Sequence, residues 1–501
     1  MIFGIDLGTT YSVCSYIDEN GEAQIITNME GQRTTPSVVY FESENSMVVG
    51  QTAKENSICC PGDVVSAIKN HMGEKGYQFT TTFGQSYSPE VISGLILRKL
   101  VSDANQYLGN EQPQNRVVIT IPAYFTDAER TATENAARIA GLELVRTINE
   151  PTAAALYYAV KSKLEHANIL IYDLGGGTFD VTIIRVDGSE VNVKSTKGMK
   201  DVGGRFFDEE IVTQIADYID DKYDVDLEKE EYLDVYQDLF NRAEKAKISL
   251  CRQEKAIIPI RTGEFKESYT LTREDFEKIV AKLYKRTEYC VKSAIKDAGI
   301  TEKDIDKVIL VGGSSRIPYI ENQLTALLGI TPSHEVNPDE VVAMGAALFG
   351  KQLESVDSST KTISDVCSHS IGISALDEMT FKKYNRILIK RNTTLPAKTC
   401  LPFRTASENQ EKIELSVTEG EFKELCDVRI ISEAEITLPP NLPKGTRVEV
   451  EISLDTSQLV HLWLRIPSVN YETELNFSRI SNLSDQEVEK LTGLIADYEV
   501  S

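Results

Sequence analysis

Two segments of the chain share an order of residue types that suits phosphate binding. Residues 2–10 and 169–178 each run from an apolar stretch into Asp-Leu-Gly and a turn of Gly and Thr, before a second apolar-rich stretch. Glycine lets a turn backbone approach a ligand closely, and its bare amides with threonine hydroxyls form a phosphate cradle. Asp6 and Asp173 stand at matching points and can hold a magnesium ion through water. Two such hairpins that face each other would bind one nucleotide from both sides.

The elements around these turns alternate between strands and helices up to about residue 350, which predicts an α/β architecture. Residues 116–122 have the apolar pattern of a buried strand. Residues 126–129, Thr-Asp-Ala-Glu, form a capping box that opens a helix, and Gly141 ends it. Further helices are predicted over residues 88–108, 208–223 and 234–250.

The composition changes after residue 353. Residues 354–370 are rich in Ser, Thr and Asp, which predicts a linker. Apolar and polar residues then alternate in short runs such as 412–417, and this period of two predicts antiparallel strands. Residues 484–487 are a second capping box, which opens one amphipathic helix. We expect its apolar stripe to consist of Val488, Leu491, Leu494, Ile495 and Tyr498.

The bulk composition limits the classes of function. The chain has 53 Lys and Arg against 77 Asp and Glu, a net charge of −24. This excess of acid argues against nucleic acid and against an anionic membrane surface as partners, because both are bound through cationic groups. No run approaches about 18 apolar residues, and a strand that starts at Ile2 leaves no room for a signal peptide, so we expect a cytoplasmic protein. The eight cysteines lack C-x-x-C spacing and are expected to be reduced thiols.

Seven ordered motifs resemble those of the Hsp70 (DnaK-like) chaperones. They are G-I-D-L-G-T-T (4–10), A-I-K (67–69), I-P-A-Y-F-T-D-A-E-R (121–130), G-L-E-L-V-R-T-I-N-E-P-T-A-A-A-L (141–156), Y-D-L-G-G-G-T-F-D-V (172–181), V-G-G-S-S-R-I-P (311–318) and N-P-D-E (337–340). The resemblance implies an α/β actin-like (ribonuclease H-like, duplicated) ATPase domain followed by an antiparallel β-sandwich substrate-binding domain and a short C-terminal helix. The implied limits are 1–353 for the ATPase domain, 354–370 for the linker, 371–480 for the sandwich and 481–501 for a remnant lid helix.

The resemblance also implies which residues hydrolyse ATP. Lys69 matches the catalytic lysine, whose charge would stabilise the γ-phosphoryl group in the transition state. Asp6 and Asp173 match the positions that hold hydrated Mg²⁺. The groups that orient the attacking water or bind cations are matched by Glu150, Asp180 and Thr178. We favour a carboxylate that aims the water over one that accepts its proton. Potassium ions beside the phosphates are implied by the resemblance alone.

The other positions that match ATP or ADP contacts lie around the phosphates and the nucleoside. They are Thr9, Thr10, Tyr11, Gly175, Gly176 and Gly177 for the phosphates, and Gly204, Glu244, Lys247, Gly313, Ser314, Arg316 and Asp339 for the nucleoside. Glu244 and Lys247 are three residues apart on one predicted helix face, so both can reach the ribose hydroxyls. Arg316 can lay its planar guanidinium against adenine.

Three further positions match groups that couple the two domains: Pro122 and Arg130 as a switch pair, and Asp365 in the linker. The linker departs from the family, which usually carries a run of Leu before Asp-Val. Here Ile363 is the one large apolar residue in 362–364, so we expect weak docking of the linker. The lid is also reduced to a single helix. Positions that match the peptide slot are Ile373, Leu376, Phe403, Ala406, Ile413 and Leu415, all of which suit an ordinary sandwich core equally well.

The resemblance therefore implies an ATP-dependent chaperone that binds unfolded or extended polypeptide segments, with ATP hydrolysis controlling their affinity. The altered linker and short lid favour an alternative, a nucleotide-dependent binding module dedicated to one partner. A sugar kinase or actin-type filament protein would share the ATPase fold, but the appended sandwich and the motif around Lys69 argue against both. A J-domain co-chaperone and a nucleotide exchange factor are implied as partners.

Overall fold

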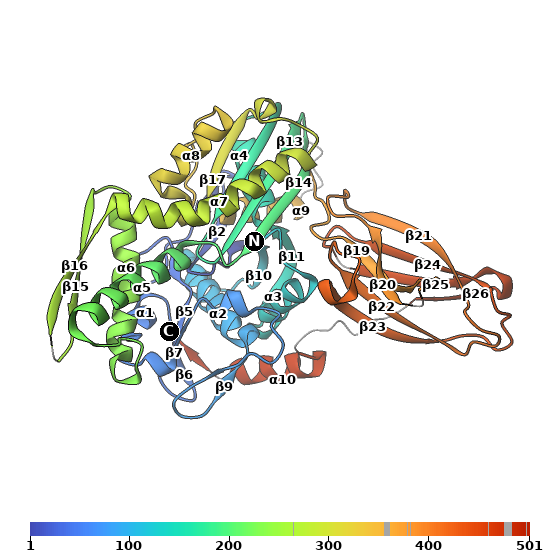
Figure 1. Ribbon diagram of the computed structural model, residues 1–501, viewed down its shortest axis with the longest axis horizontal. Coiled ribbons are helices and arrows are strands. Elements are labelled where there is room, and N and C mark those ends of the chain that lie inside the picture. Colours follow the sequence, from blue (N-terminus) through green and yellow to red (C-terminus); the bar gives the residue numbers. More distant parts are fainter. Residues whose placement is uncertain are drawn as a thin grey trace.

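The computed structural model describes residues 1–263, 265–354, 361–377, 379–380, 382–458, 460–474, 483–496 and 498–501. Figure 1 shows a large α/β part that carries an elongated all-β part on one side, with the C-terminal helix α10 beneath the α/β part. Residues 355–360 of the predicted linker and residues 475–482, which span the predicted boundary between sandwich and lid, lie outside the described residues.

Two mixed sheets form the centre of the α/β part. The first has the order β11-β10-β1-β2-β3, and the second has the order β17-β12-β13-β14-β18. Their strands are β1 (Phe3–Asp6), β2 (Tyr11–Ile17), β3 (Ala23–Ile25), β10 (Arg116–Ile121), β11 (Glu143–Asn149), β12 (His166–Leu174), β13 (Thr178–Asp187), β14 (Glu190–Lys200), β17 (Lys307–Val311) and β18 (Thr362–Ser364). The pairs β1-β2 and β12-β13 are antiparallel hairpins, as the duplicated motif predicts.

Smaller sheets extend both halves of the α/β part. The order β27-β6-β5-β7 is built from β27 (Glu499–Val500), β6 (Ser46–Val49), β5 (Val38–Phe41) and β7 (Val64–Ser66). Two-stranded sheets are formed by β8 (Phe79–Thr80) with β9 (Ser86–Tyr87) and by β15 (Lys255–Arg261) with β16 (Lys266–Thr272), and β4 (Thr35–Pro36) pairs with β2.

Helices surround these sheets, and a side chain caps the start of three of them, α2, α3 and α7. They are α1 (Gln51–Asn56), α2 (Pro89–Leu108), α3 (Asp127–Ile139), α4 (Glu150–Lys161), α5 (Gly204–Tyr223), α6 (Leu233–Leu250), α7 (Arg273–Asp297), α8 (Pro318–Leu328) and α9 (Val341–Glu354). Thr126 and Glu129 form the predicted capping box of α3, and the Ser88 side chain caps α2. Helices α4 and α9 pack so closely that a Cβ on Gly345 would lie 1.9 Å from the Ala153 carbonyl oxygen. This close packing joins the two sheets, because α9 covers the first and α4 contacts the second.

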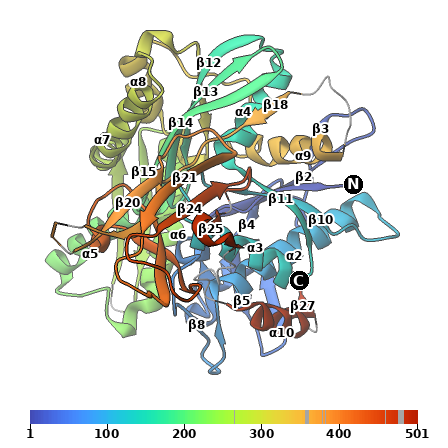
Figure 2. The ribbon, with the colours of Figure 1, turned by 90° about the vertical axis from the view of Figure 1, so that its right-hand side faces the viewer.

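The all-β part, which we call the sandwich, consists of two antiparallel four-stranded sheets, β20-β19-β22-β23 and β21-β24-β25-β26. The strands are β19 (Ile371–Leu376), β20 (Lys383–Ile389), β21 (Ala397–Arg404), β22 (Lys412–Glu419), β23 (Arg429–Thr437), β24 (Arg447–Leu454), β25 (Val460–Ile466) and β26 (Tyr471–Glu474). Alternate residues of both sheets meet in one apolar core, as their period of two predicts. Figure 2 looks onto this part from its free side.

The linker is docked in this structure, and our expectation of weak docking, which concerns its strength, stays a prediction. Strand β18 pairs in parallel with β14, with Ile363 opposite Val191. The Ile363 side chain packs against the cluster that contains Ile2 and Val118. Backbone pairing therefore supplies part of the docking that the missing leucines would otherwise provide.

The C-terminal segment lies against the first half of the α/β part (Figure 2). Helix α10 (Asp485–Ala496) begins at the predicted capping box of Ser484 and Glu487. Val488, Ile495 and Tyr498 are buried, whereas Leu494, which we expected in the same stripe, is 47% exposed. Its exposure is a correction to the predicted stripe. After the helix, β27 pairs in parallel with β6.

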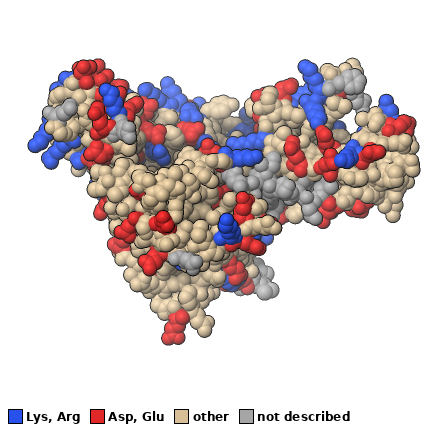
Figure 3. All heavy atoms as spheres, turned by 90° about the horizontal axis from the view of Figure 1, so that it is seen from below, with Lys and Arg blue, Asp and Glu red and all other residues tan. Residues whose placement is uncertain are grey.

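Across the part of the chain that the structure describes, no helix is both long and apolar enough to span a membrane. All eight cysteines are free thiols, as predicted. In Figure 3, acidic and basic side chains are interspersed over the face seen from below, so the negative net charge is not confined to one region of this face.

Candidate nucleotide site

The two Gly/Thr turns contact each other across the cleft between the sheets. The position that a Cβ on Gly176 would take lies 2.0 Å from Thr10 Oγ1. A Cβ on Gly177 would lie 2.4 Å from Asn70 Oδ1 and 3.0 Å from Thr9 Cγ2. A side chain at either glycine would collide with the opposite turn, so glycine is required here for close approach. The predicted arrangement of facing hairpins is therefore present.

Lys69 and Glu150 meet at the base of this cleft. Lys69 belongs to the short 3-10 helix Ile68–His71, and Glu150 is the first residue of α4. The Lys69 Nζ to Glu150 Oε1 distance is 2.7 Å, and both residues are buried, at 7% exposure each. Burial lowers the pKa of Lys69, but Glu150, Asp6 and Asp173 outweigh it, so the pKa is raised overall. The cleft therefore holds a permanently charged ammonium group.

Asp6, Asp173 and Asp180 gather around this pair at the ends of their strands. Burial, followed by repulsion from Glu150, raises the pKa of Asp6 to about 7 and that of Asp180 to about 8. The same causes raise the pKa of Asp173 well above its usual value. Asp6 Oδ1 accepts a hydrogen bond from Thr120 Oγ1 at 3.2 Å, and Asp180 Oδ1 accepts one from the Tyr124 amide at 3.2 Å. The site thus gathers four carboxyl groups around one lysine, which is more negative charge than that lysine neutralises once the carboxyls ionise.

This charge imbalance fits a divalent cation. Magnesium is usually held by one or two carboxylates together with phosphates and waters, rather than by a cage of side chains. Among the described residues no three His, Cys, Asp or Glu side chains form such a cage. Asp6 and Asp173, one from each hairpin, are the carboxylates placed to hold it beside the phosphate turns. A bound cation would lower the pKa values of these carboxyls, because it favours their ionised forms.

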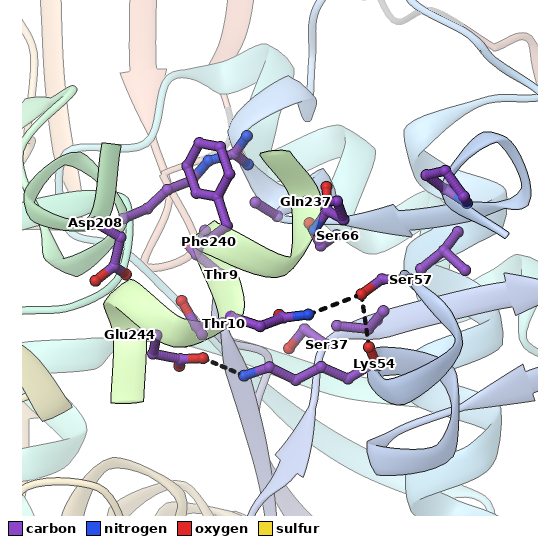
Figure 4. A pocket seen from close by; sticks show the side chains of 16 residues that line it. Thr9, Thr10, Ser37, Lys54, Ser57, Ser66, Asp208, Gln237, Phe240 and Glu244 are labelled. Carbon is purple, nitrogen blue, oxygen red and sulfur yellow. Dashed lines mark hydrogen bonds and ion pairs between the residues drawn. The ribbon is translucent and has the colours of Figure 1, made fainter. Parts of the chain in front are cut away.

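A cavity of about 170 Å³ lies beside the turns, lined by residues of α1, α5 and α6 (Figure 4). In it, Glu244 accepts hydrogen bonds from Lys54 Nζ and from Tyr11 OH, the latter at 3.2 Å. Lys247 Nζ donates to the Gly204 carbonyl at 2.8 Å and to Asp208 Oδ2 at 2.6 Å. The structure therefore brings together Tyr11, Gly204, Glu244 and Lys247, as predicted for one binding region.

Lys54 and Asp208 are site residues that sequence reasoning missed. Each pairs with a predicted residue, Lys54 with Glu244 and Asp208 with Lys247. Lys54 comes from α1, a six-residue helix with no periodic signal, and Asp208 stands in a helix whose acidic residues suit a solvated face. The pairings could not be predicted from the sequence, because each residue meets its partner from a different element.

The remaining nucleoside positions lie around the turn after β17. Ser314 Oγ donates to the Gly175 carbonyl at 2.8 Å, and a Cβ on Gly204 would lie 2.5 Å from that hydroxyl. Arg316 is exposed and forms an ion pair with Asp339 at 2.6 Å. A Cβ on Gly313 would lie 3.1 Å from Asp339 Oδ1. These contacts connect the second phosphate turn with the exposed guanidinium group.

Arg130 and Asp365, two of the predicted coupling residues, belong to one polar chain between the cleft and the linker. The buried Arg130 guanidinium donates to the carbonyls of Phe125 at 3.1 Å and Ala123 at 3.0 Å and to Asn149 Oδ1 at 3.1 Å. Asn149 Nδ2 in turn donates to Asp365 Oδ2 at 2.9 Å. Pro122 precedes this segment, and its carbonyl accepts from the Phe125 amide at 3.1 Å. Because Asn149 directly precedes Glu150, the chain ends one residue from the ion pair with Lys69.

The six predicted slot residues do not share one environment. Ile373 and Leu415 are buried in the sandwich core, and Phe403 and Ile413 are half-buried against it. Leu376 and Ala406 are exposed. Arg386 lies over the Phe403 ring at 5.0 Å from its centroid. Burial thus favours a core role for Ile373 and Leu415 and leaves Leu376 open to solvent.

Comparison with known proteins agrees with this geometry. The family model for the Hsp70 protein matches residues 2–81 and 74–499. The chain is 41% identical over 497 residues to the chaperone protein DnaK of Mycoplasma mycoides subsp. mycoides, covering 98% of this chain and 82% of that relative. A match of this length and identity, over motifs that the structure gathers into one cleft, shows that the chain belongs to the Hsp70 family.

Proposed function

We propose that this protein is an Hsp70-type molecular chaperone that hydrolyses ATP to control its affinity for extended polypeptide segments. The observation that carries the proposal is the buried pair of Lys69 and Glu150 beneath two facing phosphate turns. A buried ion pair contributes little to stability. A catalytic role toward the γ-phosphate therefore explains this pair better than a structural role does. We assign residues 1–353 to an actin-like ATPase domain, 354–370 to the linker, 371–480 to the peptide-binding sandwich and 481–501 to a remnant lid.

In the proposed reaction a water oxygen bonds to the γ-phosphorus of ATP while the bond to the bridging oxygen breaks, which gives ADP and inorganic phosphate. Glu150 and Asp180 orient the water, Thr178 lies at the start of the same strand as Asp180, and the Lys69 ammonium stabilises charge that develops on the phosphoryl oxygens. Magnesium, when bound, would neutralise the phosphates and polarise them. Asp6 and Asp173 are the residues proposed to hold it. Potassium beside the phosphates stays a prediction from the resemblance.

The sandwich is proposed to receive an extended peptide, with backbone hydrogen bonds and one apolar side chain supplying the contact. Of the six candidates, Leu376, with 51% exposure, and Ala406 are open to a ligand. The hydrogen-bonded chain of Arg130, Asn149 and Asp365 is the proposed route between this site and the cleft. A J-domain co-chaperone and an exchange factor are the proposed partners of the cycle.

The test is ATP turnover measured with and without an extended apolar peptide. We expect the peptide to change the steady-state rate of phosphate release, because binding at the sandwich shifts the docked contacts that end beside Glu150. A peptide of equal length with Asp in place of its apolar residues is the control. A protein that turns over ATP equally under all three conditions would contradict the proposed coupling, and one that does not turn over ATP would contradict the proposed enzyme.

A further inference from the structure

His369 lies at the end of the predicted linker, two residues before β19 of the sandwich, and contacts Tyr124 of the α/β part. The two rings lie 4.3 Å apart between centroids at an interplanar angle of 58°. His369 Nε2 is also 3.1 Å from the Tyr124 carbonyl oxygen. A carbonyl only accepts hydrogen bonds, so Nε2 must carry a proton in this contact. Tyr124 is thus fixed from the sandwich side by both its ring and its backbone.

Tyr124 in turn contacts Asp180 in the cleft. The Tyr124 amide donates to Asp180 Oδ1 at 3.2 Å. Gly198 of β14 lies under both residues: a Cβ there would be 2.3 Å from Asp180 Oδ1 and 2.5 Å from Tyr124 Cβ. Close-packed groups of this kind cannot move independently. A displacement of Tyr124 must therefore be transmitted to Asp180.

His369 stands among several charged groups at this interface. Desolvation lowers its pKa from 6.5, and Arg130 lowers it further, while the Tyr124 carbonyl, Glu421 and Glu129 act in the opposite direction. The titratable and charged groups around it are Glu129, Arg130 and Asp127 on α3, Tyr124 before α3, Glu419 on β22, Glu421 after β22, and Cys367 on its own segment. The net lowering means that a neutral imidazole forms this contact at neutral pH.

We propose that His369 is a positioning residue for ATP hydrolysis, which acts through Tyr124 to hold Asp180 in one orientation and keeps hydrolysis slow while the sandwich is docked. The inference rests on the proposed ATPase function. A water-orienting carboxylate speeds hydrolysis only in the geometry that the reacting water needs, so an Asp180 whose orientation is set by the Tyr124 amide and by Gly198 instead of by the water slows the reaction. Release of His369 would remove the outer support of this packing.

The first experiment compares single-turnover hydrolysis of pre-bound ATP by the full chain and its His369→Ala and His369→Gln variants. We expect His369→Ala to hydrolyse faster by about 3- to 10-fold, a change of about 0.7–1.4 kcal/mol in the barrier. We expect ATP affinity to change less than about two-fold, because His369 lies outside the nucleotide cavity. His369→Gln keeps an N–H donor and should stay within about two-fold of the unsubstituted chain.

The second experiment is a pH profile of the same rate. Because the docked pKa of His369 is lowered, its contact is intact above about 6.5 and is lost as pH falls. The ratio of the unsubstituted rate to the His369→Gln rate should therefore increase between about pH 7.5 and 5.5. His461→Gln is the matched control, because His461 lies on β25 of the sandwich beside Asp455. The ratio of the His461→Gln rate to the His369→Gln rate should show the same pH dependence as the ratio for the unsubstituted chain.

A third variant separates the role of His369 from general undocking. Arg391→Ala breaks the 2.8 Å ion pair with Asp297 on α7 without removing any atom of the contact between the His369 ring and the Tyr124 carbonyl. It should retain the pH dependence that His369→Gln loses. The inference is overturned if His369→Ala hydrolyses at the unsubstituted rate or more slowly, or if His369→Gln keeps the full pH dependence. Failure of the unsubstituted chain to hydrolyse ATP would instead overturn the proposed function.

Discussion

The predicted nucleotide site and the predicted peptide slot consist of opposite kinds of residue, and this difference decides how much their sequences reveal. The cleft gathers the buried residues Lys69, Glu150, Asp173 and Asp180. Burial of charged groups carries a desolvation cost, which core formation alone does not explain. The slot candidates are apolar, and burial of an apolar side chain is already explained by core formation. A buried charge in an ordered motif therefore points to function, whereas a buried isoleucine does not.

The largest effect is expected where the cleft loses its ammonium group. Lys69→Ala should reduce single-turnover hydrolysis by about 100-fold or more, because the charge that stabilises the transition state is gone. It also leaves Glu150 buried without its partner, at a cost of about 3–5 kcal/mol if the carboxylate stays ionised.

Lys54→Ala is the comparison, because Lys54 pairs with Glu244 at the nucleoside end of the site. It should weaken ATP binding more than it slows hydrolysis, and equal loss of hydrolysis in both variants would contradict the separate roles.

The slot can be tested by two residues on strand β19 that differ in burial. Ile373 is 1% exposed, whereas Leu376 is 51% exposed. We expect Ile373→Ala to destabilise the sandwich by about 2–4 kcal/mol, through a core cavity, and Leu376→Ala by less than about 0.5 kcal/mol. Trp463, the only tryptophan of the chain, lies on β25 and reports unfolding of the sandwich by its fluorescence.

Peptide affinity completes this second comparison. Leu376→Ala should weaken binding of an extended apolar peptide measured by fluorescence anisotropy, because the lost side chain is available to a ligand. If Leu376→Ala binds peptide as the unsubstituted chain does while its stability is also unchanged, Leu376 is excluded from the slot.

Between the two regions, we expect Glu419 to make docking depend on pH. One of its carboxyl oxygens, Oε2, is buried and has no hydrogen-bond partner among the described residues, and burial with repulsion from Asp127 raises its pKa to about 8. An acid whose docked pKa is raised stabilises the docked state at low pH and loses this contribution as pH rises towards about 8. Over about pH 6.5–8, where His369 is neutral, docking should weaken by at most about 1.4 kcal/mol per pH unit. Glu419→Gln should remove this slope.

Trypsin cleavage after Lys361 measures this docking, because Lys361 Nζ is held by the carbonyls of Leu164 and Gly188 at 2.8 Å each when the linker is docked. The cleavage rate of the unsubstituted chain should rise from pH 6.5 to 8 more steeply than that of Glu419→Gln, after correction with a free lysine peptide. Parallel profiles for the two proteins would show that Glu419 does not titrate on docking.

The smallest effect is expected at the linker itself. Ile363→Ser should weaken docking by about 1 kcal/mol, because its side chain is only partly buried against Ile2 and Val118. Thr362→Ser, at an exposed neighbour in the same strand, is the control. Faster cleavage after Lys361 in Ile363→Ser than in Thr362→Ser would support a side-chain contribution. Equal cleavage would assign the docking to the backbone pairing of β18 with β14 alone.

The sequence predicted the hairpins, the capping boxes at Thr126 and Ser484, and the strand pattern of the sandwich, because each depends on residues close together in the chain. It could not predict Lys54 and Asp208, whose partners come from distant elements. The apolar content of the linker also could not predict the backbone hydrogen bonds of β18, because that content measures only side-chain burial. The contact of His369 with Tyr124 has no sequence signal for the same reason, as it exists only when the two parts dock.

The central claim is that two facing hairpins bind one metal-bound nucleotide, and titration calorimetry tests it most directly. ATP with Mg²⁺ should bind the full chain at a single site, and Asp173→Asn should lose most of the magnesium-dependent part of the affinity, because Asp173 is the carboxylate of the second hairpin. Absence of any binding heat with adenine nucleotides over a range of temperatures, or full magnesium-dependent affinity in Asp173→Asn, would contradict the account.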